Sequence, residues 1–405
     1  MSLRLERDSF RGLPIGIDLT HFRELRMRAR SKVHACVMGN IDLVRPLGLA
    51  GIPCMVAAPP GNPVLHSRFV RKASSWEDDE ANAEASIEAL LHFGAAQPEP
   101  PVLYYEGDRQ LLLVSRYREK LAKAYRFVIA DPALVEDLTD KARFQALAER
   151  MGLPVPAAQH LNASSRTSAE IELRYPVVIK PVRNREAWAS IESSGKALIV
   201  DTAEAMQALW PRLAAVNLDF MVQEAIPGPE SRIESYHVYV DQDGATVAEF
   251  TGRKIRTFPL SCGHSTALET TDVADVRALG RDIVRKIDLR GVAKLDFKRD
   301  PDGRLFILEI NPRFSLWHHL GAIAGVNIPA LVYADLVHLP RAEGRTARAG
   351  VRWCKPWEDF RAAWASGVST STWLLWTLRC EAKSMIAWDD PMPLLRGVLS
   401  NLSHR

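Results

Sequence analysis

The chain has 405 residues, of which 47% are hydrophobic and 25% charged, a composition typical of a globular protein with two or three domains. The formal net charge of +3 gives no reason to expect a nucleic-acid-binding surface. Five scattered cysteines without CxxC spacing argue against a disulfide framework or a zinc site and favour a reducing cytoplasm. The N-terminus lacks the apolar core of a signal peptide, and no run approaches the ~20 apolar residues of a membrane-spanning helix.

The first third of the chain has the pattern of an open parallel sheet. After a polar, Arg-rich lead-in at residues 1–32, a short apolar run ends at Gly39, and a helical pattern and a second apolar run follow it. This order predicts a β-α-β unit with Gly39 and Asn40 at the carboxyl end of the first strand, where such folds bind ligands. A plain tight turn is the simpler explanation for a single glycine. The pattern continues with a helix over 77–94, a strand over 100–107 and a helix over 109–127.

The middle of the chain mixes helices and strands as α+β domains do. A helical pattern over 132–152 ends at a glycine, and another over 203–216 is broken or bounded by Pro211. Asp243-Gly244 and Asp302-Gly303 each lie between two strand patterns, which is a strong hairpin signal. The remaining predicted elements are a strand over 175–182, a strand leaving into a turn over 219–228, and an amphipathic helix over 275–291.

The composition changes from about Arg341, because more than half of the ten tryptophans lie beyond that point. The run TWLLWTL favours a core helix. An interfacial membrane helix is the alternative, since tryptophan beside Arg379 and Lys383 suits a headgroup boundary. The sequence therefore predicts a small helical C-terminal region, with a core helix and a membrane-surface helix as the two alternatives.

The stretch LFILEINPRF (305–314) ends a hydrophobic strand with three polar side chains at alternating positions. Because strand side chains two apart share a face, Glu309, Asn311 and Arg313 are expected to point together. Asp296 lies on the preceding strand of the same hairpin and can come within a few ångströms. Carboxylate and amide oxygens suit magnesium, so Asp296, Glu309 and Asn311 are candidate metal ligands. A salt-bridged surface hairpin is the alternative.

Two lysines are candidates for phosphate contacts. Lys180 ends the buried strand VVIK, where a lysine is costly unless an anion pairs with it. Lys141 lies near the start of a helix, where an anionic ligand would offset an unfavourable interaction with the helix dipole. Either lysine alone would more commonly be a salt-bridge partner.

A proline-glycine turn, QEAIPG, follows the strand that begins at 219. Its exposed backbone groups can recognise an adenine edge, and Glu230 follows at a reach suited to ribose hydroxyls. An ordinary loop has the same composition.

Together and in this order, Lys141, VVIKP, QEAIPG and D-F-K followed by E-I-N-P-R resemble the ATP-grasp superfamily. FTGRKIRTFP and GHSTALET are most similar to its carboxylate–amine ligase branch, which includes D-aspartate ligase-like proteins. The resemblance implies an α/β and α+β protein. Its expected parts are an N-terminal Rossmann-like pre-ATP-grasp domain at 1–133, an ATP-grasp domain at 134–340 with subdomains at about 134–220 and 221–340, and a small Trp-rich helical region at 341–405.

The resemblance also implies roles for individual residues around an ATP cleft. The expected phosphate contacts are Lys141 and Lys180, and the adenine and ribose contacts are Gln223, Glu224, the backbone of Ala225 and Ile226, and Glu230. Asp296, Glu309 and Asn311 would hold Mg²⁺, with Mn²⁺ as a substitute. Lys254 and Arg256, two apart on one strand face, would reach the γ-phosphate and the forming acyl phosphate, which Arg313 would stabilise. Asp108 and Arg109 could face the same cleft, although a surface position is more common.

The implied reaction joins a carboxylate to an amine through an acyl phosphate and releases ADP and phosphate. Phosphoryl transfer needs positioning and charge neutralisation, which agrees with a candidate set of lysines, arginines and acids. The expected partners are small-molecule carboxylates and amines, such as amino acids or an envelope precursor, and not nucleic acid. A cytoplasmic homo-oligomer is expected.

Two alternatives remain open at the level of sequence. One is a non-catalytic nucleotide-binding scaffold, and the other is an enzyme that uses bicarbonate, of the carboxylase or carbamoyl phosphate type. The loop after Lys180 contains Ser193, Ser194, Gly195 and Lys196 but only one glycine. It therefore departs from the glycine-rich lid of many ATP-grasp proteins.

Overall fold

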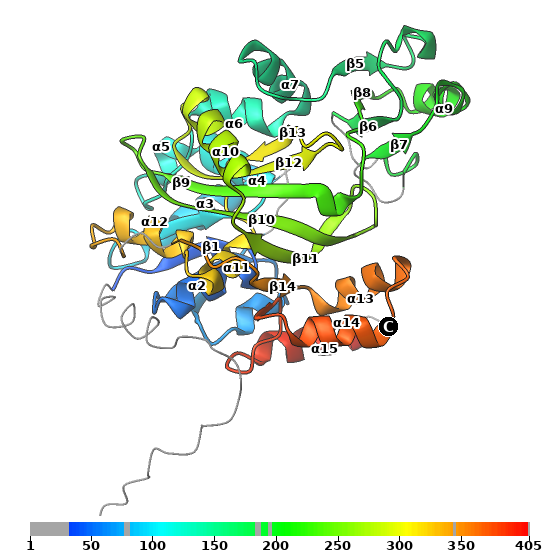
Figure 1. The fold of residues 1–405 in the computed structure, drawn as a ribbon. Coiled ribbons are helices and arrows are strands. Elements are labelled where there is room, and N and C mark those ends of the chain that lie inside the picture. Colours follow the sequence, from blue (N-terminus) through cyan, green and yellow to red (C-terminus); the bar gives the residue numbers. More distant parts are fainter. Residues whose placement is uncertain (1–31, 77–81, 183–187, 193–196, 343–345, 404–405) are drawn as a thin grey trace, which may run out of the picture.

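The computed structural model describes residues 32–76, 82–182, 188–192, 197–342 and 346–403 (Figure 1). The lead-in up to residue 31 and the loop residues Ser193, Ser194, Gly195 and Lys196 lie outside these ranges.

The N-terminal part is a parallel sheet covered by helices, as the β-α-β pattern predicts. Its strands lie in the order β3-β2-β1-β4, and all three pairings are parallel. Strands β1, β2 and β4 are buried along their whole length, as expected of a sheet covered on both faces. The elements are β1 (Ala35–Met38), α2 (Ile41–Leu49), β2 (Cys54–Ala58), η1 (Pro63–His66), β3 (Val70–Ser75), α3 (Ala83–Ala95), β4 (Val102–Tyr105), α4 (Asp108–Arg116) and α5 (Arg118–Leu121).

Two helices, α6 (Pro132–Thr139) and α7 (Lys141–Arg150), replace the single helix predicted over 132–152. Asp140 between them has an extended backbone, and its carboxylate accepts hydrogen bonds from the N–H groups of Ala142 and Arg143 at 2.9 and 3.0 Å. An aspartate cap thus starts a new helix at Lys141.

A small antiparallel sheet, β5-β8-β6-β7, stands beyond one end of the central sheet (Figure 1). Helix α9 continues through Pro211, so the predicted break there is wrong. The sheet has its own core, which includes Trp188 and Phe220. The elements are β5 (Ala158–Asn162), η3 (Ser168–Glu170), β6 (Val177–Pro181), β7 (Leu198–Val200), α9 (Ala203–Val216) and β8 (Asp219–Glu224).

The large central sheet has the order β13-β12-β9-β10-β11-β14-β15. Both predicted hairpins are present, with Gly244 and Gly303 at φ +87° in their turns, a conformation that favours glycine. The elements are η4 (Glu230–Arg232), β9 (Ile233–Val240), β10 (Thr246–Phe258), β11 (His264–Thr271), α10 (Ala274–Lys286), β12 (Gly291–Arg299), β13 (Leu305–Asn311), α11 (Trp317–Ala324) and α12 (Ile328–Leu336).

The C-terminal region is helical, but it also extends the central sheet by two short strands. Strand β14 pairs with β11 and carries β15 at its other side. Helix α13 packs against β10 and β11, below the sheet in the view of Figure 1. The elements are β14 (Arg352–Cys354), α13 (Pro356–Ala365), α14 (Thr370–Leu378), β15 (Ala382–Lys383) and α15 (Met392–Ser403).

Within the described ranges, no single helix has the length and apolar composition of a membrane span. Helices α11 and α12 meet that criterion only as a pair, bent by 90°.

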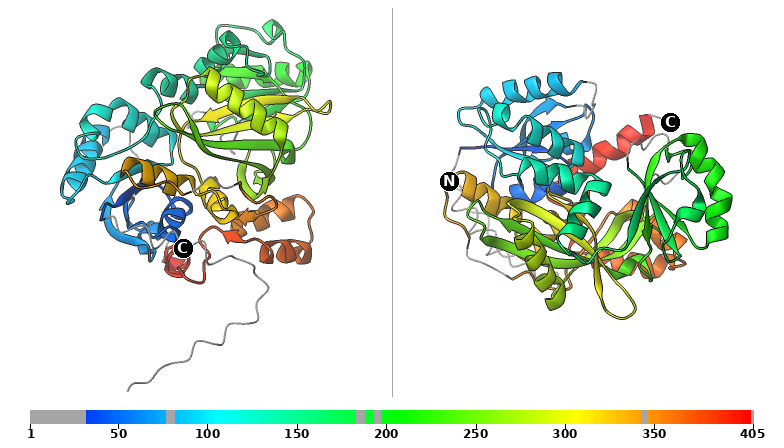
Figure 2. Two further views of the ribbon diagram at one scale, coloured as in Figure 1. Left: turned by 60° about the vertical axis from the view of Figure 1, so that its left-hand side comes forward. Right: turned by 90° about the horizontal axis from the view of Figure 1, so that it is seen from above.

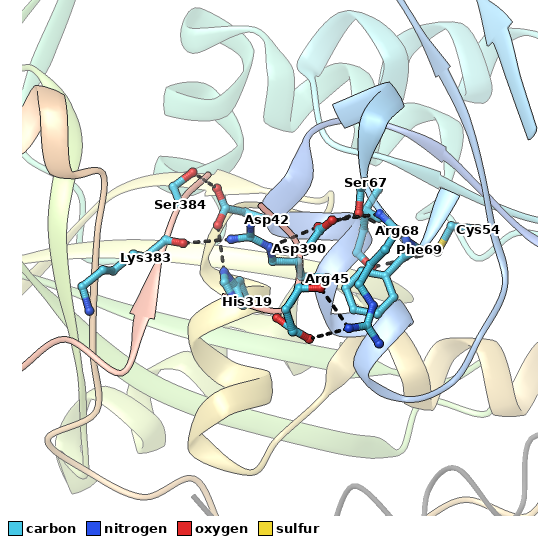
Figure 3. Close-up of polar contacts among 12 residues, drawn as sticks. Asp42, Arg45, Cys54, Ser67, Arg68, Phe69, His319, Lys383, Ser384 and Asp390 are labelled. Atoms are coloured by element: carbon cyan, nitrogen blue, oxygen red, sulfur yellow. Dashed lines mark hydrogen bonds and ion pairs between the residues drawn. The ribbon is translucent and has the colours of Figure 1, made fainter. Parts of the chain in front are cut away.

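The buried carboxylate of Asp42 joins the N-terminal part to the two parts that follow it in the chain (Figure 3). One oxygen accepts from His319 Nδ1 at 2.9 Å and from Trp353 Nε1 at 3.0 Å, and the other accepts from Ser384 Oγ at 2.5 Å. Burial would raise the pKa of this carboxyl, but the hydrogen bonds, above all that of His319, hold it below its usual range. Asp42 is therefore an ionised acceptor shared by α2, α11 and the C-terminal strands.

We expect Asp42→Ala to lower the free energy of unfolding by about 3 kcal/mol, because it leaves several buried donors without an acceptor. Urea unfolding at neutral pH measures this. Asp389→Ala is the matched control, since the Asp389 carboxylate forms a solvent-exposed ion pair with Arg68 and such pairs contribute about 1 kcal/mol or less. Equal losses in the two variants would contradict the role of Asp42.

Candidate functional site

The closing hairpin of the central sheet brings the predicted acids together. Asp296 on β12 and Glu309 on β13 are direct partners across the hairpin. The Nδ2 group of Asn311 donates to Glu309 Oε1 at 3.0 Å, and Arg313 Nη2 donates to Asn311 Oδ1 at 3.1 Å. The alternating polar side chains at the end of the strand therefore form one continuous polar row, as the sequence predicts.

Two lysines neutralise Asp296. Lys294 Nζ lies 2.7 Å from Asp296 Oδ2 and 3.5 Å from Glu309 Oε1, and Lys254 Nζ lies 3.6 Å from the same Asp296 oxygen. Ser235 Oγ donates to the other Asp296 oxygen at 2.5 Å. Sequence reasoning missed Lys294. Its signal is the same alternation that selected the acids, since it lies two residues before Asp296 on one strand face.

The charges of this cluster follow from its burial. Asp296 is 1% exposed, so burial by itself would raise the pKa of its carboxyl, but Lys294 and Lys254 hold that pKa well below the usual range. Burial likewise would lower the pKa of the Lys294 ammonium, and Asp296 and Glu309 instead raise it. Asp296, Glu309 and Lys294 are therefore charged at neutral pH.

Lys180, at the end of β6 in the small sheet, faces the same cluster. Its Nζ donates to Gln223 Oε1 on β8 at 2.7 Å. Burial lowers the pKa of its ammonium, and the nearby carboxylates of Glu309 and Glu230 oppose that shift. A lysine of the small sheet and an acid of the central sheet are thus within electrostatic reach of each other.

The other residues of the expected nucleotide site lie along the small sheet and its exit. Lys141 Nζ donates to the carbonyl of Pro181 at 2.9 Å, which places it beside the end of β6. The Ala225 N–H donates to the carbonyl of Pro176, so this amide is already paired. Ile226 follows Ala225 in the turn and is half-buried.

Two acids, one at the end of β8 and one at the start of η4, belong to the same expected nucleotide site. The carboxylate of Glu224 is held by Arg174, whose Nη2 lies 2.6 Å away. Glu230 Oε1 lies 3.7 Å from Lys298 Nζ, and Glu230 also acts on the ammonium of Lys180. Glu230 therefore faces the lysines, whereas Glu224 is engaged at the surface.

Arg313 connects the site to the N-terminal part of the chain. Its Nε lies 2.5 Å from Asp108 Oδ1, at the start of α4. Glu106, at the end of β4, accepts from the Asn40 N–H at 2.8 Å, and Gly39 leaves room for its side chain because an added Cβ would come within 2.8 Å of Glu106 Oε2. Gly39 and Asn40 predicted a ligand site at the carboxyl end of the parallel sheet. In the structure, this end carries acids close to Arg313.

Lys254 and Arg256 do not share one set of neighbours. The pairing of β10 with β11 shifts in register between these two residues, which interrupts the alternation on which their common face was predicted. Lys254 reaches Asp296, whereas Arg256 pairs with Asp359 of the C-terminal region at 2.7 Å.

The three predicted metal ligands differ in how well their positions suit a hard cation such as Mg²⁺. Asp296 and Glu309 are convergent carboxylates, the ligand type that Mg²⁺ prefers. Asn311 turns its amide nitrogen toward Glu309 and its oxygen toward Arg313, so it could join these ligands only after its amide rotates by half a turn. Among the described residues, no group of three His, Cys, Asp or Glu side chains surrounds a common point. Two carboxylates and one amide are therefore the largest set the hairpin offers.

Known structures identify the architecture. A family model described as "ATP-grasp in the biosynthetic pathway with Ter operon" matches residues 217–355. The chain is similar to a solved N5-carboxyaminoimidazole ribonucleotide synthetase in complex with ADP, with a TM-score of 0.61 and 15% identity over 79% of this chain and 80% of that one. The protein has the ATP-grasp fold. The fold class expected from the sequence is confirmed.

The sequence relatives include ligases of the branch that the motifs indicate. The chain is 26% identical over 242 residues to a D-aspartate ligase from Enterococcus faecium, which covers 57% of each chain. It is 27% identical over 224 residues to a D-alanine–D-alanine ligase from Pseudomonas putida, over 51% of this chain and 65% of that one. The matches thus span less than two thirds of either ligase. The resemblance to ATP-grasp carboxylate–amine ligases is confirmed.

We expect Asp296→Asn to lower the free energy of unfolding by about 3 kcal/mol, because it leaves two lysines in the interior without their main counterion. Glu309→Gln should cost less than about 1 kcal/mol, since the Glu309 side chain is 55% exposed. Urea unfolding of both variants at pH 7 without ligands tests this difference. Equal stability of Asp296→Asn and the parent protein would show that Lys254 and Lys294 do not depend on this carboxylate.

Proposed function

We propose that this ATP-grasp protein is an ATP-dependent carboxylate–amine ligase that forms an amide bond through an acyl phosphate. The observation that carries the proposal is the contact of Lys254 and Lys294 with Asp296, with Glu309 also beside Lys294. Lys180 lies within electrostatic reach of Glu309, and Arg313 binds Asn311, whose amide donates to Glu309. Lysine and arginine side chains around two carboxylates suit a polyphosphate with its divalent cation. The named ligase relatives support an amine as the second substrate.

ATP would lie between the small sheet and the central sheet. In this arrangement Lys141 and Lys180 contact phosphates, and the turn at Ala225 and Ile226 receives the adenine beside Gln223 and Glu224. Glu230 binds the ribose. The exposed Arg174 orients the carboxylate of Glu224 through an ion pair.

The reaction has two steps. A carboxylate oxygen of the first substrate attacks the γ-phosphorus of ATP, and the bond to the β,γ-bridging oxygen breaks to release ADP. The amine nitrogen then attacks the acyl carbon, loses a proton, and displaces phosphate as the C–N bond forms. Lys254 and Arg256 neutralise charge on the transferring phosphoryl group, and Arg313 stabilises the acyl phosphate and the oxyanion of the tetrahedral intermediate.

Asp296 and Glu309, with Asn311 after rotation of its amide, would hold Mg²⁺ or Mn²⁺, which neutralises phosphate charge when bound. Lys294 lies between the two acids and would have to move toward a substrate anion when a cation takes its place. Lys294 is therefore a further candidate for binding the carboxylate substrate.

Substrate-dependent release of ADP and phosphate tests the proposal. The assay combines ATP and Mg²⁺ with a panel of amino acids, sugar acids, amines and bicarbonate, and hydroxylamine is added to trap an acyl phosphate as a hydroxamate. A hydroxamate from one carboxylate supports the ligase and names its first substrate. ADP release with bicarbonate alone would instead favour a carboxylase or carbamoyl phosphate type of reaction. Tight ATP binding without ADP release across the panel would favour a nucleotide-binding scaffold.

Glu309→Gln should lower turnover by about 100-fold or more at fixed Mg²⁺ while the protein stays folded, because one metal-binding carboxylate is lost. Steady-state assays over a range of Mg²⁺ concentrations measure the change. Near-parental turnover would show that Glu309 does not hold the metal. Glu381→Gln, at an exposed position of the C-terminal region, controls for the loss of one negative charge.

Arg313→Ala should leave ATP affinity within about threefold of the parent while turnover falls by about 100-fold, since the guanidinium acts on the acyl group and not on the nucleotide. Calorimetry gives the affinity and the ADP-release assay gives the turnover. A parallel loss of ATP affinity would instead identify Arg313 as a nucleotide contact.

A further inference from the structure

Arg256, expected to act on phosphate, is held by a carboxylate from the C-terminal region. Its Nε donates to Asp359 Oδ1 at 2.8 Å and its Nη2 donates to Asp359 Oδ2 at 2.7 Å. Asp359 lies on α13 and is fully buried at 0% exposure. Two parallel bonds of this kind fix the plane of a guanidinium as well as its position.

The carboxylate of Asp359 is fully used. Besides Arg256, Thr266 Oγ1 donates to Oδ1 at 2.9 Å, and Trp373 Nε1 donates to Oδ2 at 3.0 Å. Each oxygen thus accepts two hydrogen bonds, so the buried carboxylate has partners for both of its oxygens. These donors come from β10, β11 and α14, so the orientation of Asp359 is determined by three elements.

A tryptophan holds the guanidinium from a second direction. The Arg256 guanidinium carbon lies 4.3 Å from the centre of the Trp376 ring. Trp376 thus covers one face of the Arg256 guanidinium, and Asp359 binds its Nε–Nη2 edge. The Nη1 edge is the one that remains open. In the described part of the chain, Nη1 makes no hydrogen bond, and the Arg256 side chain keeps 13% of its surface exposed.

Helix α13 also contacts the last residue of β10. Arg361 of α13 lies over the ring of Phe258, 4.4 Å from its centre. In the turn that follows β10, the thiol of Cys262 lies within electrostatic reach of Lys180, Lys254 and Glu230. Helix α13 therefore supports the end of a strand whose following turn approaches the expected phosphate site.

We propose that Asp359 and Trp376 are positioning residues, which hold the free edge of Arg256 toward an anionic oxygen of the γ-phosphate. The C-terminal region, which the sequence left without a role, would then be part of the ATP site. This inference rests on the proposed nucleotide site, but it does not require the ligase reaction.

Binding measurements test the proposal apart from catalysis. The readout is the ratio of the dissociation constants for ADP and for the ATP analogue AMP-PNP, each with Mg²⁺, because this ratio isolates the contribution of the terminal phosphate. The parent protein should prefer AMP-PNP. Asp359→Asn and Arg256→Ala should each reduce that preference by about tenfold, the worth of one well-oriented charge-assisted bond.

The double variant Arg256→Ala/Asp359→Asn should match Arg256→Ala, because Asp359 acts only through the guanidinium. Trp376→Leu leaves the bonds between Arg256 and Asp359 in place and should also reduce the preference for AMP-PNP. It replaces Asp359→Asn in the test if that variant does not fold. Glu358→Gln, at the exposed neighbouring position on α13, should leave the ratio unchanged.

An unchanged ratio in Asp359→Asn or Trp376→Leu would overturn the proposal, as would a parent protein that binds ADP and AMP-PNP equally. A further loss in the double variant, beyond that of Arg256→Ala, would identify Asp359 as a purely structural residue and would also overturn it. Absence of substrate-dependent ADP release in the parent would contradict the ligase proposal while the affinity ratio still decides the role of Asp359.

Discussion

The charge balance at Asp296 is the constraint on which the candidate site depends. The carboxylate is buried and lies 2.7 Å from Lys294 and 3.6 Å from Lys254. Without it, two ammonium groups would lie close together in a poorly solvated interior, which is unfavourable for both. With it, both ammonium groups have a counterion, and in the proposed function a polyphosphate would bind beside them. The hairpin pairing that places Asp296 opposite Glu309 is therefore also what permits the lysines to be there.

Acids from distant segments orient the basic side chains of the site. Asp108 of the N-terminal part holds Arg313, and Asp359 of the C-terminal region holds Arg256. The N-terminal part and the C-terminal region approach the central sheet from different sides (Figure 2). The buried Asp42 joins the N-terminal part to α11 and to the C-terminal region through hydrogen bonds. The candidate site thus takes residues from all parts of the described chain, although its most recognisable motif lies on one hairpin.

The match to the family model is concentrated on the segment that contains the hairpin motif. The family match covers residues 217–355, which include the hairpins of the central sheet. Under the proposed function, the alternating charged positions on these strands would serve phosphate and metal binding, a task that does not depend on which carboxylate or amine reacts. The fold therefore does not specify the substrates.

Local patterns in the sequence were sufficient for the hairpins, the parallel N-terminal sheet and the polar row from Glu309 to Arg313. Each of these follows from strand periodicity or from a turn of the Asp-Gly type, which act over a few residues. The sequence did not reveal the helix break at Asp140, the register shift between Lys254 and Arg256, or the contact of Lys294 with both acids. The pairing of Arg256 with Asp359 joins residues 103 positions apart. Only the tertiary structure decides such contacts, because they depend on how sheets and helices pack and not on local periodicity.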